Sequence, residues 1–329
     1  MTDDPLIKPA LVTDSRLRNA WGITFGPTSP FWVSGNAAAI ATLYNVAPAN
    51  DATTINATSV IIPGAGTITG QVFSGTANFG SSRFIFVSED GLISGWTGQP
   101  ETTANVILAA ANPANVYKGV TLATVGVDDY LYAANFRTGT IDVIKGVPTA
   151  PDLTGNFIDP GIPAGFAPFN IQLLGGKLYV AYALQNPNLF DDVRGPGNGF
   201  VSVFDTNGNF LNRVASQGTL NSPWGLAIAP FSFGQFAGKL LVGNSGDGTI
   251  NAFDLGTNTF VGQLMDDRGV PITVSDLKAL TIGNNAAAGS TQRVYFAAGN
   301  QGGLHGVFGV LVPTNAGYLP VIFKNAVKP

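Results

Sequence analysis

A repeat of about fifty residues runs through the whole sequence and constrains its fold more than any other feature. The two clearest copies are Arg18-Asn-Ala-Trp-Gly-Ile-Thr-Phe25 and Asn221-Ser-Pro-Trp-Gly-Leu-Ala-Ile228. The positions equivalent to the glycine of these copies are Gly22, Gly70, Gly119, Asn170, Gly225 and Ala279, at intervals of 48, 49, 51, 55 and 54 residues. A period of this length is typical of propellers and solenoids. Six units, starting near residues 18, 67, 116, 167, 221 and 276, therefore fill residues 1–329 as a single domain.

Each unit has the pattern of a small antiparallel sheet. The first apolar run is followed by a second, such as Arg83-Phe-Ile-Phe-Val-Ser88, and by a third after a Gly-containing turn, such as Thr138-Gly-Thr-Ile-Asp-Val-Ile144. Asp-Gly and Thr-Gly before β-branched residues indicate hairpins. One such sheet cannot bury both faces, whereas six arranged radially cover one another, and a solenoid or a stacked sandwich fits less well. We therefore predict an all-β fold, a six-bladed β-propeller with blades of three to four antiparallel strands, its ring closed by strands from both termini (8–12 and 319–323).

Charged residues are scarce in this chain. It has 16 basic and 20 acidic residues among 329, which gives a net charge of −4 and a pI near 4.9. This balance argues against nucleic acid and anionic membranes as partners. The chain has no cysteine, so disulfides and thiolate ligands are excluded, and no apolar stretch is long enough to span a bilayer. We expect a monomer.

Motifs along most of the chain resemble those of one protein family. They include Phe31-Trp-Val-Ser34, Thr42-Leu-Tyr-Asn45, Glu89-Asp-Gly91, Ile93-Ser-Gly-Trp96, Tyr132-Ala-Ala-Asn-Phe136, Ala167-Pro-Phe-Asn-Ile-Gln172, Gly195-Pro-Gly-Asn-Gly-Phe200 and Ser222-Pro-Trp-Gly-Leu226. In these motifs the chain is similar to a family of uncharacterised bacterial and fungal proteins, many of which carry a secretion signal and a PEP-CTERM sorting tail. The resemblance implies a secreted or cell-surface β-propeller, with its signal peptide absent from this chain, and no assigned reaction.

The chain departs from that family at three places. It has Gly35 where the family usually has Asp, and Lys278 where the family has an aromatic residue. Gln301-Gly-Gly-Leu304 stands where the family has acidic residues just before the histidine. If those acidic positions bind a ligand in relatives, this chain has lost or changed that site.

The second runs of the units offer a candidate metal site. Aligned without gaps, they place Glu89, Asn135 and Asn244 at one position of the repeat. In a propeller such strand ends converge on one face of the central channel. Their oxygens would suit Ca²⁺, a hard cation that six-bladed lactonases also hold at this kind of site. The alternative interpretation is that Asn and Asp before Gly only shape turns.

His305 is the only histidine of the chain and a candidate general acid or base. Asp191 or Asp192, in the fourth unit, would orient its ring. A histidine that only bonds a turn carbonyl is the alternative interpretation. The loop that holds both aspartates and Arg194, residues 185–199, breaks the repeat. Insertions of this kind tend to lie on the binding face, so Arg194 is a candidate ligand-binding residue.

Aromatic residues recur in the first runs. Trp21, Phe169 and Trp224 occupy matching positions, and Tyr117 lies one residue off the same position in another unit. A ring of aromatics would form a stacking platform for a sugar or an aromatic ligand. Packing between blades explains the same residues.

Two lysines fall in equivalent first runs. Lys118 and Lys278 would lie next to the channel mouth. A pair of amines there would bind a carboxylate or phosphate, or would only extend to solvent.

These features predict a protein that binds a small organic ligand or glycan at the mouth of its channel. If it is an enzyme, we expect metal-assisted hydrolysis of an ester or lactone. The alternative is a non-catalytic extracellular surface or matrix interaction module whose channel is plugged by side chains. Walker loops, dinucleotide fingerprints, His-Glu-x-x-His and EF-hand loops are absent from the sequence, so we expect no nucleotide or flavin cofactor.

Overall fold

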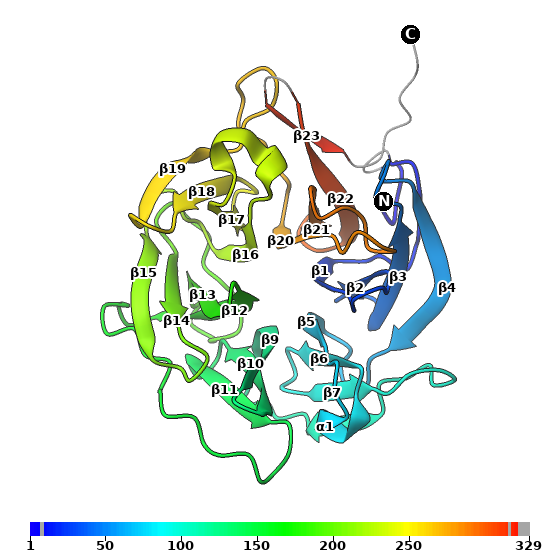
Figure 1. Cartoon of the computed structure of the whole chain (residues 1–329), viewed down its shortest axis with the longest axis vertical. Coiled ribbons are helices and arrows are strands. Elements are labelled where there is room, and N and C mark those ends of the chain that lie inside the picture. The colour runs from blue at the N-terminus through cyan, green and yellow to red at the C-terminus, as the bar shows by residue number, and fades with distance from the viewer. Residues whose placement is uncertain (7–9, 315–316, 322–329) are drawn as a thin grey trace.

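Six antiparallel sheets stand around a central axis in the computed structural model of the chain (Figure 1). The structure describes residues 1–6, 10–314 and 317–321. The first three blades are β1 (Ala20–Thr24), β2 (Phe31–Gly35), β3 (Ile40–Val46), β4 (Thr53–Ile61); β5 (Ile68–Phe73), β6 (Phe84–Ser88), β7 (Ile93–Trp96), β8 (Val106–Ala109); and β9 (Tyr117–Val125), β10 (Asp128–Asn135), β11 (Thr140–Lys145). The last three are β12 (Phe166–Leu174), β13 (Lys177–Leu184), β14 (Phe200–Phe204), β15 (Phe210–Ser216); β16 (Pro223–Ile228), β17 (Leu240–Asn244), β18 (Ile250–Asp254), β19 (Thr259–Gln263); and β20 (Leu277–Ile282), β21 (Val294–Asn300), β22 (His305–Pro313), β23 (Tyr318–Val321). The predicted six-bladed β-propeller is confirmed.

The first strand of each blade lies at the centre of the ring, where neighbouring first strands contact one another. The glycine of the repeat makes this approach possible. A Cβ atom on Gly22 would lie 2.7 Å from the carbonyl oxygen of Thr69, and one on Gly225 would lie 2.5 Å from that of Lys278. Glycine is therefore required at these two positions, because a Cβ atom there would push the neighbouring inner strands apart.

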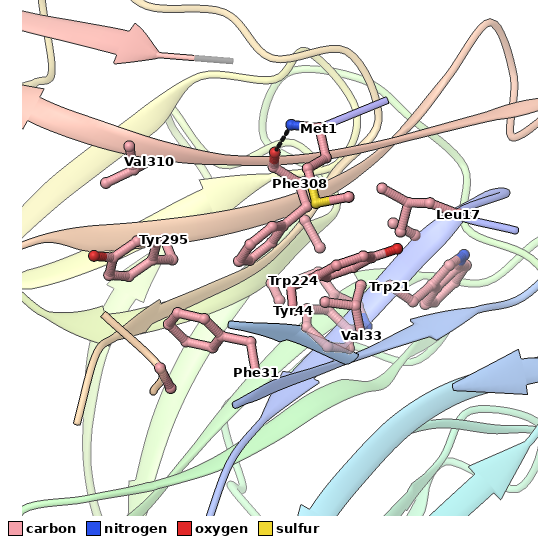
Figure 2. Packing of buried hydrophobic residues seen from close by; sticks show 14 of the residues in the cluster. Met1, Leu17, Trp21, Phe31, Val33, Tyr44, Trp224, Tyr295, Phe308 and Val310 are labelled. Atoms are coloured by element: carbon pink, nitrogen blue, oxygen red, sulfur yellow. Dashed lines mark hydrogen bonds between the residues drawn. The ribbon is translucent and has the colours of Figure 1, made fainter. Parts of the chain in front are cut away.

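Side chains between the blades form the core. Between the first and last blades, Phe31 and Tyr44 pack on Phe308 with ring centroids 5.3 and 5.6 Å apart, and Tyr295 lies 4.7 Å from Phe31 (Figure 2). These rings are fully buried. Aromatic pairs of this kind add stability beyond the area that they bury, so this interface is well suited to hold the ring shut.

The N-terminal residues and the last described strand, β23, both join the sixth blade. β23 pairs with Val310–Pro313 of β22, and Thr2 forms an antiparallel bridge with Val307 of the same strand. The nitrogen of Met1 donates to the carbonyl oxygen of Phe308 at 2.6 Å (Figure 2). The described N-terminal contacts with β22 thus come from residues 1–3, and residues 10–12 of the predicted segment 8–12 form no strand. Residues 8, 9, 322 and 323 of the predicted closing strands lie outside the described residues.

Helical structure in the described residues is limited to short segments. These are α1 (Asn78–Ser81) and the 3₁₀ helix η1 (Phe231–Phe236). Within the described part of the chain, no helix has the length and apolar character needed to cross a membrane.

Candidate functional site

A cavity of about 400 Å³ opens where strand ends meet at one end of the central axis. We call it the mouth cavity. Its lining residues are Asn19, Trp21, Asn36, Glu89, Phe190, Asp191, Asp192, Arg194, Asp276, Lys278, Gly302 and Gly303. Asn36 and Glu89 directly follow β2 and β6, and residues 190–194 belong to the long loop between β13 and β14. The loop that breaks the repeat therefore covers part of the mouth cavity, on the side that the sequence indicated.

An aromatic cluster lies beneath the mouth cavity. Trp21 makes edge contacts with Phe169 and Trp224, with ring centroids 6.3 and 6.1 Å apart. The indole nitrogen of Trp224 donates to the carbonyl oxygen of Lys118 at 2.9 Å and ties the cluster to β9. Tyr117 points elsewhere: its hydroxyl donates to Asp142 at 2.9 Å, and its ring packs between the second and third blades. Of the four predicted aromatic residues, Trp21 lines the mouth cavity.

The channel is nearly filled below this cluster. A void of only about 10 Å³ remains among inner-strand residues that include Gly22, Gly70 and Asn170. The amide of Asn170 donates to the carbonyl oxygen of Trp224 at 2.8 Å. Because so small a void holds little more than one water-sized probe, the mouth cavity is closed from below.

Lys118 is buried beside the mouth cavity and is fully paired. Its side chain is 1% exposed, and its ammonium forms a close ion pair with Glu89. A second carboxylate, that of Asp191, lies 3.2 Å from Nζ. Glu89 also accepts a hydrogen bond from Asn36 Nδ2 at 3.1 Å. The lysine charge is thereby compensated, as a buried charge requires.

Lys278 is equally buried but has different neighbours. Its Nζ donates a hydrogen bond to Ser245 Oγ and lies 4.4 Å from the ring centroid of Trp21 and 5.9 Å from that of Phe169. No carboxylate of the described residues comes within 4.0 Å of this nitrogen. Burial penalises the ammonium form and lowers the pKa of Lys278 to about 8.

Arg194 crosses the rim of the mouth cavity. One of its terminal nitrogens lies 2.5 Å from Asp276 Oδ1, and its Nε lies 3.6 Å from Asp192 Oδ2. At that distance the Asp192 oxygen is not hydrogen-bonded to Arg194, and within the described residues this buried atom accepts no hydrogen bond. An acceptor of this kind is costly to leave without a donor.

The structure gives His305 a partner that the sequence did not indicate. Its Nδ1 lies 2.9 Å from Asp3 Oδ2, and the other oxygen of Asp3 accepts from the Gly306 backbone N–H at 3.0 Å. The expected partnership of His305 with Asp191 or Asp192 is wrong. Asp191 pairs with Lys118, and Asp192 lies beside Arg194. His305 follows the turn that contains Gly302 and Gly303 but does not itself line the mouth cavity. Asp3 could not be found from sequence, since it is 302 residues away.

Asn135 and Asn244 hold turns in their own blades. Asn135 Oδ1 accepts from the Val116 N–H at 3.1 Å, and Asn244 Oδ1 accepts from the Asn221 N–H at 3.1 Å. Neither residue lines the mouth cavity that contains Glu89. Within the described ranges no group of three His, Asp or Glu residues is arranged to hold a metal. These three side chains as placed do not fit a shared cation, since the amide oxygens already accept backbone hydrogen bonds, and calcium binding stays a prediction.

Sequence reasoning missed several residues that line the mouth cavity, and two of them share a backbone feature. Asn19 and Asp276 line the mouth cavity, and both have positive φ angles, 47° and 53°. Ser222, at the equivalent position of the fifth unit, has a φ of 50°. Asn and Asp tolerate this left-handed conformation better than most residues. The repeat alignment contained a signal for this position, three residues before the repeat glycine.

Searches with the sequence found relatives in one virus. Acanthamoeba polyphaga mimivirus encodes the uncharacterized protein R648, which is 30% identical over 285 residues, 82% of this chain and 69% of R648. Its uncharacterized protein L690 is 36% identical over 171 residues, 50% of this chain and 44% of L690. No family model matches the chain.

Solved structures share the fold at low sequence identity. The apo-form of the soluble aldose sugar dehydrogenase from Escherichia coli has a TM-score of 0.53 and 14% identity, covering 90% of this chain and 96% of that chain. A glucose dehydrogenase also has a TM-score of 0.53, with 12% identity over 91% of this chain and 97% of that one. At such identities the likeness concerns the propeller alone. By its similarity to R648 along most of both sequences, the chain belongs to the family of this uncharacterised mimivirus protein.

Proposed function

We propose that the protein binds a small, neutral, polyhydroxylated organic ligand, a sugar or a related polyol, in the mouth cavity. One observation carries this proposal: a cavity of about 400 Å³ brings together a buried acceptor without a donor, Asp192 Oδ2, and a buried amine, Lys278, that makes one hydrogen bond to the described residues. Cavities of this size are typical of small-molecule sites. Hydroxyl groups both donate and accept, so they satisfy both groups at once.

The charges around the mouth cavity favour a neutral ligand over an anion. Four carboxylates line it, those of Glu89, Asp191, Asp192 and Asp276, whereas Lys278 and Arg194 are the lining cations. The adjacent Lys118 leaves one more carboxylate than cations. A carboxylate or phosphate ligand would meet like charges at short range, which costs free energy in a partly buried site. The face of Trp21 adds an apolar surface on which a sugar ring can stack.

A calorimetric screen with monosaccharides and alditols tests this function. Asp192→Asn should weaken binding about tenfold or more, because a hydrogen bond to a charged acceptor is lost. Asp152→Asn is the matched control, since the Asp152 side chain is 93% exposed and neither it nor its partner Lys145 lines the mouth cavity. Two results would contradict the proposed ligand class. One is that no polyol binds, and the other is that Asp192→Asn binds a polyol as strongly as Asp152→Asn does.

A non-catalytic interaction module is the second candidate. It is supported by the packing below the mouth cavity, where residues that include Asn170 and Trp224 surround a void of only about 10 Å³. The hydrolase version needed His305 at the ligand, and His305 bonds Asp3 instead. Incubation with ester and lactone panels, followed by NMR of the products, separates the two: turnover supports an enzyme, and binding without turnover supports the module.

A further inference from the structure

The two buried lysines of the inner strands differ in a way that bears on their reactivity. Lys118 lies between two carboxylates and forms ion pairs with both. Lys278 donates a hydrogen bond to a serine hydroxyl and lies over the faces of two aromatic rings. An amine without an ion-pair partner in an apolar setting loses its proton more readily than one in solvent. The neutral amine is the form that attacks carbonyl carbon.

The charged groups that face Lys278 come from three elements. Asp192 and Arg194 belong to the loop between β13 and β14, Asp276 directly precedes β20, and Lys118 belongs to β9. The two carboxylates favour the ammonium form, the two cations oppose it, and burial outweighs them all. With the pKa of Lys278 at about 8, about a tenth of this amine is neutral at pH 7, far more than for an ordinary lysine.

We propose that Lys278 is a nucleophilic amine that captures neutral hydroxyaldehydes and hydroxyketones in the mouth cavity as imines. This inference rests on the proposed function, since the carbonyl ligand enters the same cavity. The class includes the open-chain forms of sugars and shorter compounds such as glyceraldehyde. Excess carboxylates on the cavity wall select neutral members over oxo acids.

The step balances without any co-reactant. The lone pair of Nζ adds to the carbonyl carbon, and the carbonyl oxygen takes a proton to give a carbinolamine. Loss of the hydroxyl together with the remaining N–H proton releases one water and forms the C=N bond. Ser245 Oγ already accepts a hydrogen bond from Nζ, so it orients the amine, and Asp192 offers an acceptor for the proton in transit.

Reductive trapping tests this capture on the full chain. The protein is incubated with glyceraldehyde and cyanoborohydride at pH 7, and modified lysines are mapped by mass spectrometry. Lys278 should be modified at least tenfold faster than Lys177, which is exposed in a hairpin, since much more of Lys278 is neutral. Lys118 is the matched internal control, equally buried but ion-paired, and should stay unmodified. Lys278→Met should abolish the fast modification, and glyoxylate should react more slowly than glyceraldehyde.

The pH dependence of the Lys278 modification rate and a second variant keep the test informative if Lys278→Met does not fold. The rate at Lys278 should rise through pH 8 and then level off, because its pKa is about 8. Ser245→Ala removes the acceptor of the ammonium and should shift the Lys278 profile to lower pH. Equal rates at Lys278 and Lys177 would overturn the proposal.

A polyol without a carbonyl separates this inference from the proposed function. If an alditol binds in the calorimeter and Lys278 is not modified, imine capture is wrong and the ligand site stands. If Lys278 is modified and no alditol binds or protects it, capture stands and the polyol class is wrong. Protection of Lys278 by a bound alditol supports both.

Discussion

Lys118 and Lys278 occupy the same position of the repeat, one residue before Gly119 and Ala279, yet they have opposite electrostatic surroundings. Glu89 compensates the first, and a neutral hydroxyl faces the second. Residue type and spacing predicted that both would lie near the channel mouth. They could not predict this difference, because Glu89 and Ser245 belong to other blades, directly after β6 and β17, and their approach depends on the closed ring.

Replacing each of the two lysines by Met should change the free energy of unfolding in opposite directions. Lys278→Met should raise the free energy of unfolding at pH 7 by up to about 3 kcal/mol, since a pKa lowered to about 8 reflects an unfavourable buried charge. Lys118→Met should lower it by about 3 kcal/mol or more, because Glu89 is left buried without its partner. Urea denaturation of both variants measures the difference, and equal effects would contradict it.

The gain in unfolding free energy from Lys278→Met should depend on pH. Between pH 8 and the ordinary lysine pKa, the unfolded chain binds a proton at this amine that the folded chain does not. Folding stability of the parent protein therefore rises with pH in that window. The advantage of Lys278→Met should be full below pH 8 and vanish toward the ordinary lysine pKa. An advantage that grows with pH would show that the amine is not destabilised by burial.

At the scale of elements, the repeat predicts the strands of each blade well and the segments that close the ring less well. Alternating apolar runs and Asp-Gly or Thr-Gly turns are local signals, so the meander of each blade follows from short stretches of sequence. The bridge of Thr2 to β22 is a contact between opposite ends of the chain and carries no such local signal. For the same reason the sequence predicts the closing segment at 8–12 and carries no signal for the contacts of residues 1–3 with β22.

The inner strands should tolerate no side chain at Gly225. Gly225→Ala would place Cβ 2.5 Å from the carbonyl oxygen of Lys278, so we expect a loss of about 1–3 kcal/mol of unfolding free energy. Gly75→Ala is the control, because its nearest atom, in the ring of Phe73, would be 3.4 Å away. Chemical denaturation that finds the two variants equally stable would refute the requirement for close approach.

At the scale of the whole molecule, the ring is closed next to the mouth cavity. The contact of His305 with Asp3 fastens the N-terminal segment to the strand that also pairs with β23. His305→Ala should therefore lower the free energy of unfolding by about 1 kcal/mol and leave polyol binding and Lys278 modification unchanged. Loss of polyol binding with an unchanged free energy of unfolding would instead show that His305 belongs to the ligand site.

The central claim is that the mouth cavity binds a small organic ligand. The most direct measurement is a crystal structure of the protein with an alditol. We predict the alditol in the mouth cavity, with a hydroxyl within hydrogen-bond distance of Asp192 Oδ2 and its carbon chain against Trp21. An alditol bound elsewhere, for instance in the 330 Å³ groove between the first two blades at Trp32 and Trp96, with the mouth cavity holding only water, would contradict the claim.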